Sequence, residues 1–343
     1  MKHPKSGSPI TRVVLIIKEN HSFDNYFGTF PGADGAALPD SPNPPLKDPD
    51  HTHGAWLTRE TTAVRAQFLR QDIPAYFSYV GRFTVCDKFF SEVAGPSTPN
   101  HLMLIAADSP LFVNPSRSAP PLFTLPTFPA LLEKAKLTWG NYGGYAFDFF
   151  KELKGRNKFP SVQFALDAAS GKLPSVSWVY APHGESEHPP DPQDKGSKPP
   201  VGDVTRGMQW TVDQVNAIVK GGLWPSTAIF ITWDDWGGWF DHLDSPEVET
   251  WKHDKKHPEL DGNHPAWNGT QFRYGPRVGC IVVSPYARSG HVSHVLRSHV
   301  SLLKFCETNY GTGSLNARDG GADDMSECFD FAQKPLPPPP AKP

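Results

Sequence analysis

Two pairs of oxygen-bearing side chains stand where the chain passes from apolar to polar sequence. Glu19 and Asn20 follow one run of mostly β-branched residues, and Asp234 and Asp235 follow another apolar run. Such runs predict strands that are buried on both faces, as in a mostly parallel sheet. Because ligands bind beyond the carboxyl ends of parallel strands, we expect all four side chains at one edge of the sheet. Carboxylate and amide oxygens gathered in this way are typical ligands of a divalent metal ion.

Ser97 is a further candidate for chemistry, because it precedes an apolar helical run at 102–107. The simpler interpretation is that Ser97 is the N-cap of this helix, with Pro99 tolerated in the first turn. A helix N-terminus also offers free N–H groups and positive potential, which favour a phosphate and an ionised nucleophile. The segment is not the Gly-x-Ser-x-Gly turn of an α/β-hydrolase, since Pro99 stands where the second Gly belongs. From these residues alone, both interpretations of Ser97 stay open.

Several histidines lie in segments that could line the same site. His51 and His53 occupy a long, Pro-rich region that reaches about residue 60. Surface histidines are the simpler interpretation of such a pair, but a loop of this length in a compact domain is usually functional or disordered. His188 follows an apolar run at 174–180, so it too is expected beyond the carboxyl end of a strand.

The elements that must position these residues alternate along the chain, which predicts an α/β fold. The patterns predict strands at 13–17, 83–87, 174–180, 228–233 and 278–284, and helices at 102–107, 208–219 and 301–307. We find no internal repeat and no clean linker. We therefore expect a single domain over 1–333, followed by an extended, frayed proline-rich tail at 334–343.

Composition excludes some classes of function. The net charge of −3 gives no electrostatic reason to expect binding to nucleic acid or to an anionic membrane surface. No apolar stretch approaches the roughly 18 residues of a transmembrane helix, and no signal peptide precedes the first strand. As it stands the chain is expected in the cytoplasm, unless a leader was removed. The four cysteines have no zinc-site spacing, and a Cys306–Cys328 disulfide is left open.

Six segments, taken in order, resemble the bacterial phosphoesterase family that contains phospholipases C and secreted acid phosphatases. They are Lys-Glu-Asn-His-Ser-Phe-Asp-Asn-Tyr-Phe-Gly (18–28), Asp-Pro-Asp-His-Thr-His (48–53), Gly-Pro-Ser-Thr-Pro-Asn-His (95–101), Ser-Glu-His-Pro (186–189), Trp-Asp-Asp-Trp-Gly-Gly-Trp-Phe-Asp-His (233–242), and Gly-Pro-Arg-Val with Ser-Pro-Tyr-Ala-Arg (275–288). The resemblance covers essentially residues 12–330. It implies an alkaline-phosphatase-like three-layer sandwich, with a central, mostly parallel sheet and helices on both faces. Members of this family are commonly exported to the periplasm or secreted.

The resemblance also implies roles for individual residues. One divalent ion (Mg²⁺, Ca²⁺, Mn²⁺ or Zn²⁺) would be held by Glu19, Asn20, Asp234 and Asp235. The residues expected to be catalytic are Ser97 as nucleophile with His188 and His299, and those expected to bind substrate are His51, His53, Asn100 and His101. Many phospholipase C members have Thr at the position of Ser97, so this serine is nearer to the acid phosphatase branch. The family's Asp-His-Thr-Ser appears here as Ser298-His299-Val300-Ser301, which removes an acidic partner of His299.

The function expected from these residues is metal-dependent hydrolysis of phosphate esters through a phosphoserine intermediate. The chain has no basic amphipathic helix for docking on lipid, so small soluble phosphomonoesters are the expected substrates. A phospholipase C that cleaves phosphatidylcholine-type phosphodiesters is the alternative. Two further hypotheses are a catalytically silent ligand-binding protein and a metal-free serine hydrolase. The oligomeric state is left open.

Overall fold

A single sheet forms the centre of the molecule. The computed structural model describes residues 7–115, 121–253 and 265–341; the other residues of the predicted domain and tail lie outside the described ranges. The sheet has eight strands, in the order β11 (His291–Ser293), β2 (Thr84–Cys86), β10 (Cys280–Val283), β7 (Thr227–Trp233), β1 (Arg12–Lys18), β6 (Val176–Tyr180), β4 (Trp139–Tyr142) and β5 (Lys158–Phe159). All pairs are parallel except those of β10 with β2 and β7. The prediction of a mostly parallel sheet is confirmed.

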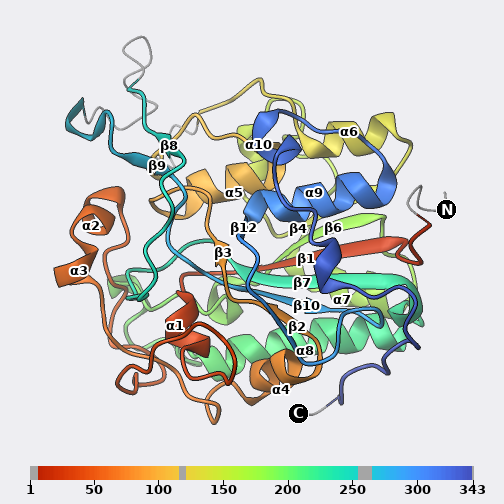
Figure 1. The fold of residues 1–343 in the computed structure, drawn as a ribbon, viewed down its shortest axis with the longest axis horizontal. Coiled ribbons are helices and arrows are strands. Elements are labelled where there is room, and N and C mark those ends of the chain that lie inside the picture. Colours follow the sequence, from red (N-terminus) through yellow and green to blue (C-terminus); the bar gives the residue numbers. More distant parts are fainter. Residues whose placement is uncertain (1–6, 116–120, 254–264, 342–343) are drawn as a thin grey trace.

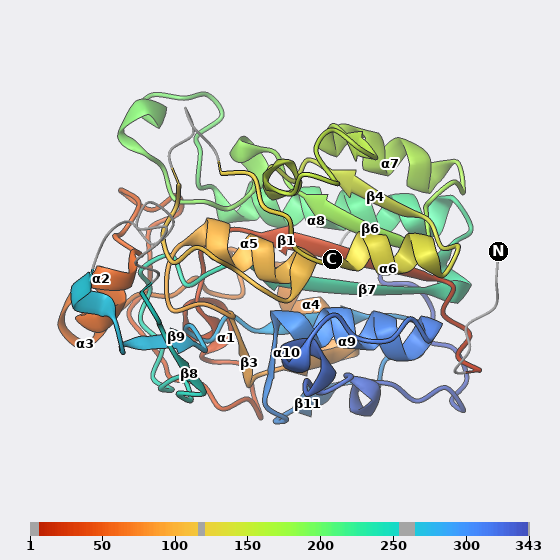
Figure 2. The ribbon, with the colours of Figure 1, turned by 90° about the horizontal axis from the view of Figure 1, so that it is seen from above.

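Helices cover both faces of this sheet, which confirms the predicted three-layer sandwich (Figure 1). One layer holds α5 (Ser97–Ala106), α6 (Phe128–Lys134), α9 (His299–Tyr310) and α10 (Ala317–Gly320). The other holds α4 (Pro74–Arg82), α7 (Ser161–Ala169) and α8 (Val204–Lys220). Figure 2 shows β1 and β7 in the middle of the sheet, where every residue of both strands is buried. Burial on both faces is the reason these strands read as unbroken apolar runs.

Some helices are longer than the apolar pattern predicts. α8 begins at Val204 because the side chain of Asp203 accepts hydrogen bonds from the amides of Thr205 and Arg206. α9 extends to Tyr310 and ends at Gly311, which adopts the left-handed conformation that favours glycine. Capping residues therefore set the ends of these helices, and the apolar pattern alone did not locate those ends. No helix in the described ranges combines the length and apolar character needed to cross a membrane.

Short elements gather at the carboxyl end of β1, the end away from the N-terminus in Figure 1. They include α1 (Phe23–Phe27), α2 (His53–Leu57), α3 (Arg59–Thr62), β3 (Phe89–Phe90), β8 (Glu249–Thr250), β9 (Gln271–Arg273) and β12 (Arg297–Ser298). The remaining short turns are 3-10 helices at Ala146–Phe149, His183–Glu185, Pro192–Asp194, Trp224–Ser226, Pro265–Trp267 and Ser326–Cys328. The region expected to be irregular up to residue 60 thus contains three short helices.

The proline-rich tail is not frayed over its described part, 334–341, so that prediction was wrong. The indole of Trp224 donates a hydrogen bond to the carbonyl of Leu336, and Arg82 donates to the carbonyls of Pro337 and Pro338. Proline lacks an N–H but keeps its carbonyl, so such a tail can be held through its acceptors. The Cys306–Cys328 disulfide is not formed: all four cysteines are free thiols, and the sulfur of Cys328 lies 3.6 Å from that of Cys86.

Candidate active site

Ser97 is the first residue of α5 and does not cap it. Pro96 occupies the N-cap position, and the Ser97 hydroxyl donates instead to Oδ2 of Asp235, 2.9 Å away. The capping interpretation was therefore wrong. A hydroxyl that is free of a capping bond and held by a carboxylate is the arrangement expected of a nucleophile.

The two oxygen-bearing pairs meet because β1 and β7 are parallel neighbours. Lys18 is opposite Trp233 in the register, so the residues that follow both strands leave the sheet side by side. Oδ1 of Asp234 accepts hydrogen bonds from the amides of Asn20 (3.1 Å) and Asp235 (2.8 Å). Asn20 has a φ of 66°, a left-handed conformation that asparagine tolerates better than most residues. The turn of the chain at this edge thus places both pairs together, as predicted.

The oxygens of this edge fit a divalent cation. Asn20 Oδ1 is buried and accepts no hydrogen bond among the described residues, and the buried Asp234 Oδ2 lies 3.3 Å from Nε2 of His101. Burial and then the Asp234 carboxylate raise the pKa values of Glu19 and Asp235. Buried carboxylates that repel one another are costly unless a cation neutralises them. Glu19, Asn20, Asp234 and Asp235 would hold such an ion.

A second group of titratable residues lies beside Asn20. Ligand atoms of Asp48, His51 and His188 lie within 4.8 Å of one another. Nδ1 of His51 is 2.8 Å from the carbonyl of Pro49, while Nε2 lies 3.2 Å from the Asn20 side-chain amide. Burial would lower the pKa of both histidines, but nearby carboxylates raise it, for His51 to about 9. Both rings therefore favour the protonated form that can bind a phosphate oxygen.

A cavity of about 510 Å³ opens next to this group. It is lined by Asp48, Pro49, Asp50, His51, Thr52, Pro96, Val113, Asn114 and Trp267. Because Pro96 directly precedes Ser97, the cavity reaches the start of α5. It is large enough to hold the alcohol part of a phosphate ester.

His101 and His299 contact Asp234 and the residue before it. His101 lies one turn after Ser97 on α5, and its Nε2 is 3.3 Å from Oδ2 of Asp234. His299 begins α9, and its Nε2 lies 2.8 Å from the carbonyl of Trp233, the residue before Asp234. Both rings are completely buried. The structure thus gives both histidines contacts that support Asp234, where we had expected substrate binding for His101 and catalysis for His299.

Two predicted substrate-binding residues do not join the site, which corrects the prediction. The Asn100 side chain is hydrogen-bonded to the loop before α5. Its Oδ1 accepts from the amides of Glu92 and Val93, and its Nδ2 donates to backbone carbonyls. His53 is buried against Phe112, with ring centroids 4.0 Å apart. Its ring nitrogens contact the Ala94 carbonyl and the Thr270 hydroxyl. Neither side chain is left free to bind a phosphate.

The buried position of His53 predicts a pH-dependent stability. Burial lowers the pKa of His53 from 6.5 to about 4. Between these values the unfolded chain takes up a proton that the folded chain excludes, so stability is present above pH 6.5 and is lost toward pH 4. On acidification from pH 6.5 to 4, wild type should lose up to about 3 kcal/mol more unfolding free energy than His53→Gln. Urea denaturation across this range measures the difference, and parallel pH profiles would contradict the prediction.

Two tyrosines near the site lie outside the sequence motifs, so the sequence did not indicate them. Tyr180 ends β6, and its hydroxyl is buried with no hydrogen-bond partner among the described residues. Its ring centroid is 5.3 Å from that of His101. Tyr145 also packs against His101, and its hydroxyl lies 2.9 Å from that of Thr98. The only available signal was the place of Tyr180 at the carboxyl end of a predicted strand.

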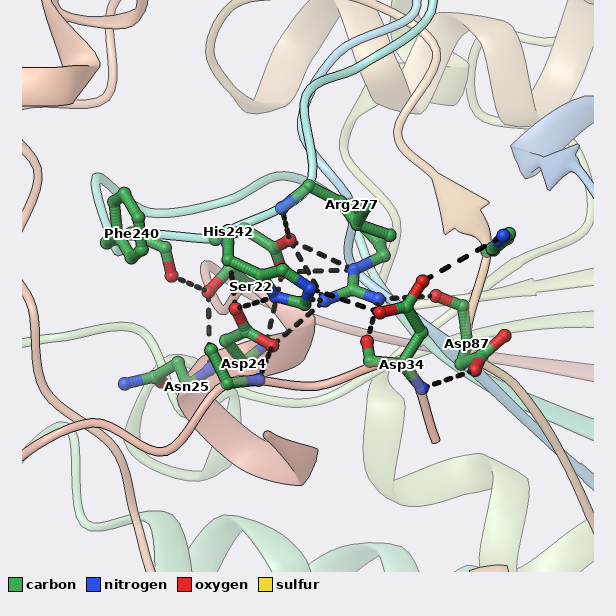
Figure 3. A network of polar contacts seen from close by, with 12 residues as sticks. Ser22, Asp24, Asn25, Asp34, Asp87, Phe240, His242 and Arg277 are labelled. Atoms are coloured by element: carbon green, nitrogen blue, oxygen red, sulfur yellow. Dashed lines mark hydrogen bonds and ion pairs between the residues drawn. The ribbon is translucent and has the colours of Figure 1, made fainter. Parts of the chain in front are cut away.

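A buried arginine holds the loops that follow β1 and β7 (Figure 3). The guanidinium of Arg277 contacts Asp24 of α1 at 2.9 Å and Asp241 at 3.0 Å. It also donates to the carbonyls of Asp34 and Asp87. Asp24, Asp241 and His242 also place one possible ligand atom each within 4.8 Å of the others, close enough to share a metal ion. Since Arg277 already neutralises these carboxylates, we assign the group a structural role.

Replacing Arg277 should destabilise the fold strongly. Both Arg277 and Asp24 have fully buried side chains, so Arg277→Met leaves two carboxylates without a buried counter-charge. We expect a loss of about 3–5 kcal/mol in the free energy of unfolding, measured by urea denaturation. Arg156→Met is the matched control, because the Arg156–Glu133 pair is exposed and should contribute about 1 kcal/mol at most. Equal losses in the two variants would contradict the prediction.

Comparison with known proteins identifies the family. The family model described as the Phosphoesterase family matches residues 10–54 and 47–313. The chain belongs to the Phosphoesterase family. Both oxygen-bearing pairs, Ser97 and the histidines of the site all fall within the matched residues.

Curated relatives of this Phosphoesterase-family chain carry phospholipase C names. Phospholipase C B of Mycobacterium tuberculosis is 27% identical, with 99% of this chain and 81% of the relative covered. Non-hemolytic phospholipase C of Pseudomonas aeruginosa is 25% identical, over 96% of this chain and 59% of the relative. Non-specific phospholipase C6 of Arabidopsis thaliana is 26% identical, over 83% and 63%.

Solved structures with similar folds include a sulfatase. A 2-O GAG sulfatase superposes with a TM-score of 0.51 at 8% identity, covering 95% of this chain and 76% of that chain. Ps i-CgsB in complex with k-i-k-neocarrahexaose also gives 0.51, at 12% identity, covering 92% and 75%. At such identities the likeness concerns the fold alone, and it agrees with the alkaline-phosphatase-like architecture of this Phosphoesterase-family chain.

Proposed function

We propose that this protein is a metal-dependent phosphoesterase that hydrolyses phosphate esters through a phosphoserine intermediate. The observation that carries the proposal is the hydrogen bond from the Ser97 hydroxyl to Asp235, 2.9 Å long, beside the unbonded Oδ1 of Asn20 and the carboxylate of Asp234. A hydroxyl in this place can attack a phosphorus atom whose negative charge is neutralised nearby. Membership in the Phosphoesterase family supports this class of reaction.

The metal-ligating residues in this proposal are Glu19, Asn20, Asp234 and Asp235. A bound divalent ion would neutralise phosphate charge and lower the pKa of the Ser97 hydroxyl. Oxygen ligands favour Mg²⁺, Ca²⁺ or Mn²⁺, with Zn²⁺ also acceptable. The fit rests on the donor atoms themselves, one of which, Asn20 Oδ1, is buried without a hydrogen bond among the described residues.

The protein residues carry out the proton and bond changes. The Ser97 oxygen forms a bond to phosphorus while the ester P–O bond breaks, and Asp235 is placed to take the serine proton. His188 donates a proton to the departing alcohol oxygen, since nearby carboxylates raise the pKa of its ring. Water then attacks phosphorus and the P–O bond to Ser97 breaks; the serine oxygen regains the proton from Asp235, and a proton of the attacking water returns to the histidine. The Tyr180 hydroxyl and the amide of Ser97 at the start of α5 add neutral donors for the phosphate oxygens.

Two substrate classes fit this chemistry. A serine nucleophile and the resemblance to acid phosphatases favour phosphomonoesters. The phospholipase C names of the relatives favour a phosphodiester that carries a lipid alcohol and a headgroup. Both classes present the same phosphate to Ser97 and differ in what occupies the neighbouring cavity.

One assay tests the proposal and separates the two classes. Hydrolysis of p-nitrophenyl phosphate and of p-nitrophenyl phosphorylcholine is measured between pH 5 and 8, before and after EDTA, with single metals added back. We expect activity that EDTA abolishes and one ion restores. Turnover of the monoester alone selects the phosphatase, and turnover of the choline ester selects the phospholipase C type. Activity that EDTA leaves unchanged would refute the metal-dependent mechanism, and hydrolysis of neither ester would refute the proposed function.

A further inference from the structure

One buried carboxylate contacts the residues that immediately precede two of the proposed metal ligands. Oε1 of Glu187 lies 3.3 Å from the ammonium of Lys18, which comes directly before Glu19. Oε2 accepts a hydrogen bond of 3.0 Å from the indole of Trp233, which comes directly before Asp234. Glu187 therefore holds the carboxyl ends of both β1 and β7.

Every oxygen of this carboxylate has partners. Oε1 also accepts from the hydroxyl of Tyr76 (2.6 Å), and Oε2 accepts from that of Tyr26 (2.9 Å). The side chains of Glu187 and Lys18 are both fully buried. A buried carboxylate with an ammonium and three further donors has one preferred position, because any movement would break a hydrogen bond that water cannot replace.

The same residue controls the segment that carries His188. Glu187 has a φ of 77°, a left-handed conformation that is uncommon for a residue with a side chain. Its carbonyl lies 3.0 Å from Nε2 of His21, the residue after Asn20. Such backbone strain persists only where the surroundings hold it, and it concentrates at functional sites. Here it aims the next residue, His188, at the site.

α8 leaves room for Glu187 only because residue 207 is a glycine. A Cβ atom at Gly207 would lie 2.2 Å from Cγ of Glu187 and 3.0 Å from the carbonyl oxygen of Glu185. Glycine within a helix costs stability relative to alanine. α8 thus contains a residue of low helix propensity, Gly207, at the position where the side chain of Glu187 packs against it.

We infer that Glu187 is a positioning residue of the catalytic centre. Its carboxylate sets Glu19 and Asp234 through Lys18 and Trp233, and its backbone sets His188. Buried ion pairs contribute little to stability compared with apolar replacements, so stability alone does not explain this arrangement. The inference rests on the proposed function for the identity of the centre that is positioned.

Two variants act on Glu187 by different routes. Glu187→Gln keeps the shape of the side chain but removes the charge that faces Lys18. Gly207→Ala keeps the charge but forces the side chain to move, while favouring the helix. The matched control is Gly81→Ala on α4, another helical glycine, which has no atom within 4 Å of an added Cβ.

The measurements are kcat and KM on p-nitrophenyl phosphate or the choline ester, affinity for Mn²⁺, and the melting temperature. For Glu187→Gln and Gly207→Ala we expect kcat to fall about 10–100-fold and Mn²⁺ affinity to fall about 10-fold. KM should change little, because the phosphate-binding groups remain. Gly81→Ala should match wild type in kcat and Mn²⁺ affinity. Adding Lys18→Met to Glu187→Gln should restore the melting temperature but not kcat.

The outcomes separate this inference from the proposed function. If wild type hydrolyses neither ester, the proposed function fails, and Mn²⁺ affinity alone then decides whether Glu187 positions the ligands. If Glu187→Gln and Gly207→Ala match Gly81→Ala in kcat and Mn²⁺ affinity, the positioning role is overturned, whatever their melting temperatures. Should Glu187→Gln fail to fold, Gly207→Ala carries the test by itself.

Discussion

Ser97→Ala is expected to lower kcat for phosphoester hydrolysis by at least about a thousandfold. The substitution removes the oxygen that would bond to phosphorus, and no other hydroxyl is bound to Asp235 among the described residues. The fold should persist, because Ser97 makes no capping bond and α5 begins without one. Steady-state kinetics on p-nitrophenyl phosphate or the choline ester measures the loss, and circular dichroism checks the fold.

A conservative variant and a direct observation sharpen this test. Ser97→Thr keeps a hydroxyl at the same carbon and should retain measurable turnover. Mass spectrometry of wild type quenched during turnover should find phosphate on the peptide that contains Ser97. Full activity in Ser97→Ala would exclude Ser97 as the nucleophile, and the proposed mechanism with it.

Asp234→Asn should reduce metal affinity and kcat together, each by at least about 100-fold. Asp234 organises this edge of the sheet: it accepts hydrogen bonds from the amides of Asn20 and Asp235 and faces Nε2 of His101. Asparagine keeps the shape but removes the negative charge that attracts a cation. The measurements are metal content after dialysis against a defined ion and turnover at saturating metal.

The control for Asp234→Asn removes a carboxylate elsewhere on the molecule. Asp244 pairs with Arg59 on the surface and is 77% exposed, so Asp244→Asn should leave metal content and kcat unchanged. A variant of Asp234 with normal metal content and a normal rate would show that the buried carboxylates serve the fold alone.

The sequence by itself determined five of the eight strands of the central sheet, including β1 and β7 and their carboxyl ends. The runs now seen as β1 and β7 are buried on both faces, and burial of that kind leaves an unbroken apolar signature. Parallel strands share one carboxyl edge, so the positions of Glu19, Asn20, Asp234 and Asp235 followed from strand assignment. Ser97 could be found as the start of a helix, but its interpretation as a cap or a nucleophile needed its partner.

Only the tertiary structure decided which polar residues near the motifs reach the site. His51 and His53 are two residues apart, yet one contacts Asn20 and the other packs on Phe112. Asn100 lies on the same helix as Ser97, but its amide is fully used by the loop before it. Loop residues have no periodicity that fixes their direction, so spacing could not separate these cases.

The residues that hold the site together were also hidden from the sequence. Glu187 and Arg277 carry charges, and charged residues are mostly exposed. Here both are buried, because each meets partners from segments far apart in the chain: Lys18 and Trp233 for Glu187, Asp24 and Asp241 for Arg277. A single residue type does not reveal such partners. A charged side chain can be buried only where the tertiary structure places oppositely charged and hydrogen-bonding groups around it, and the sequence alone does not show which groups those are.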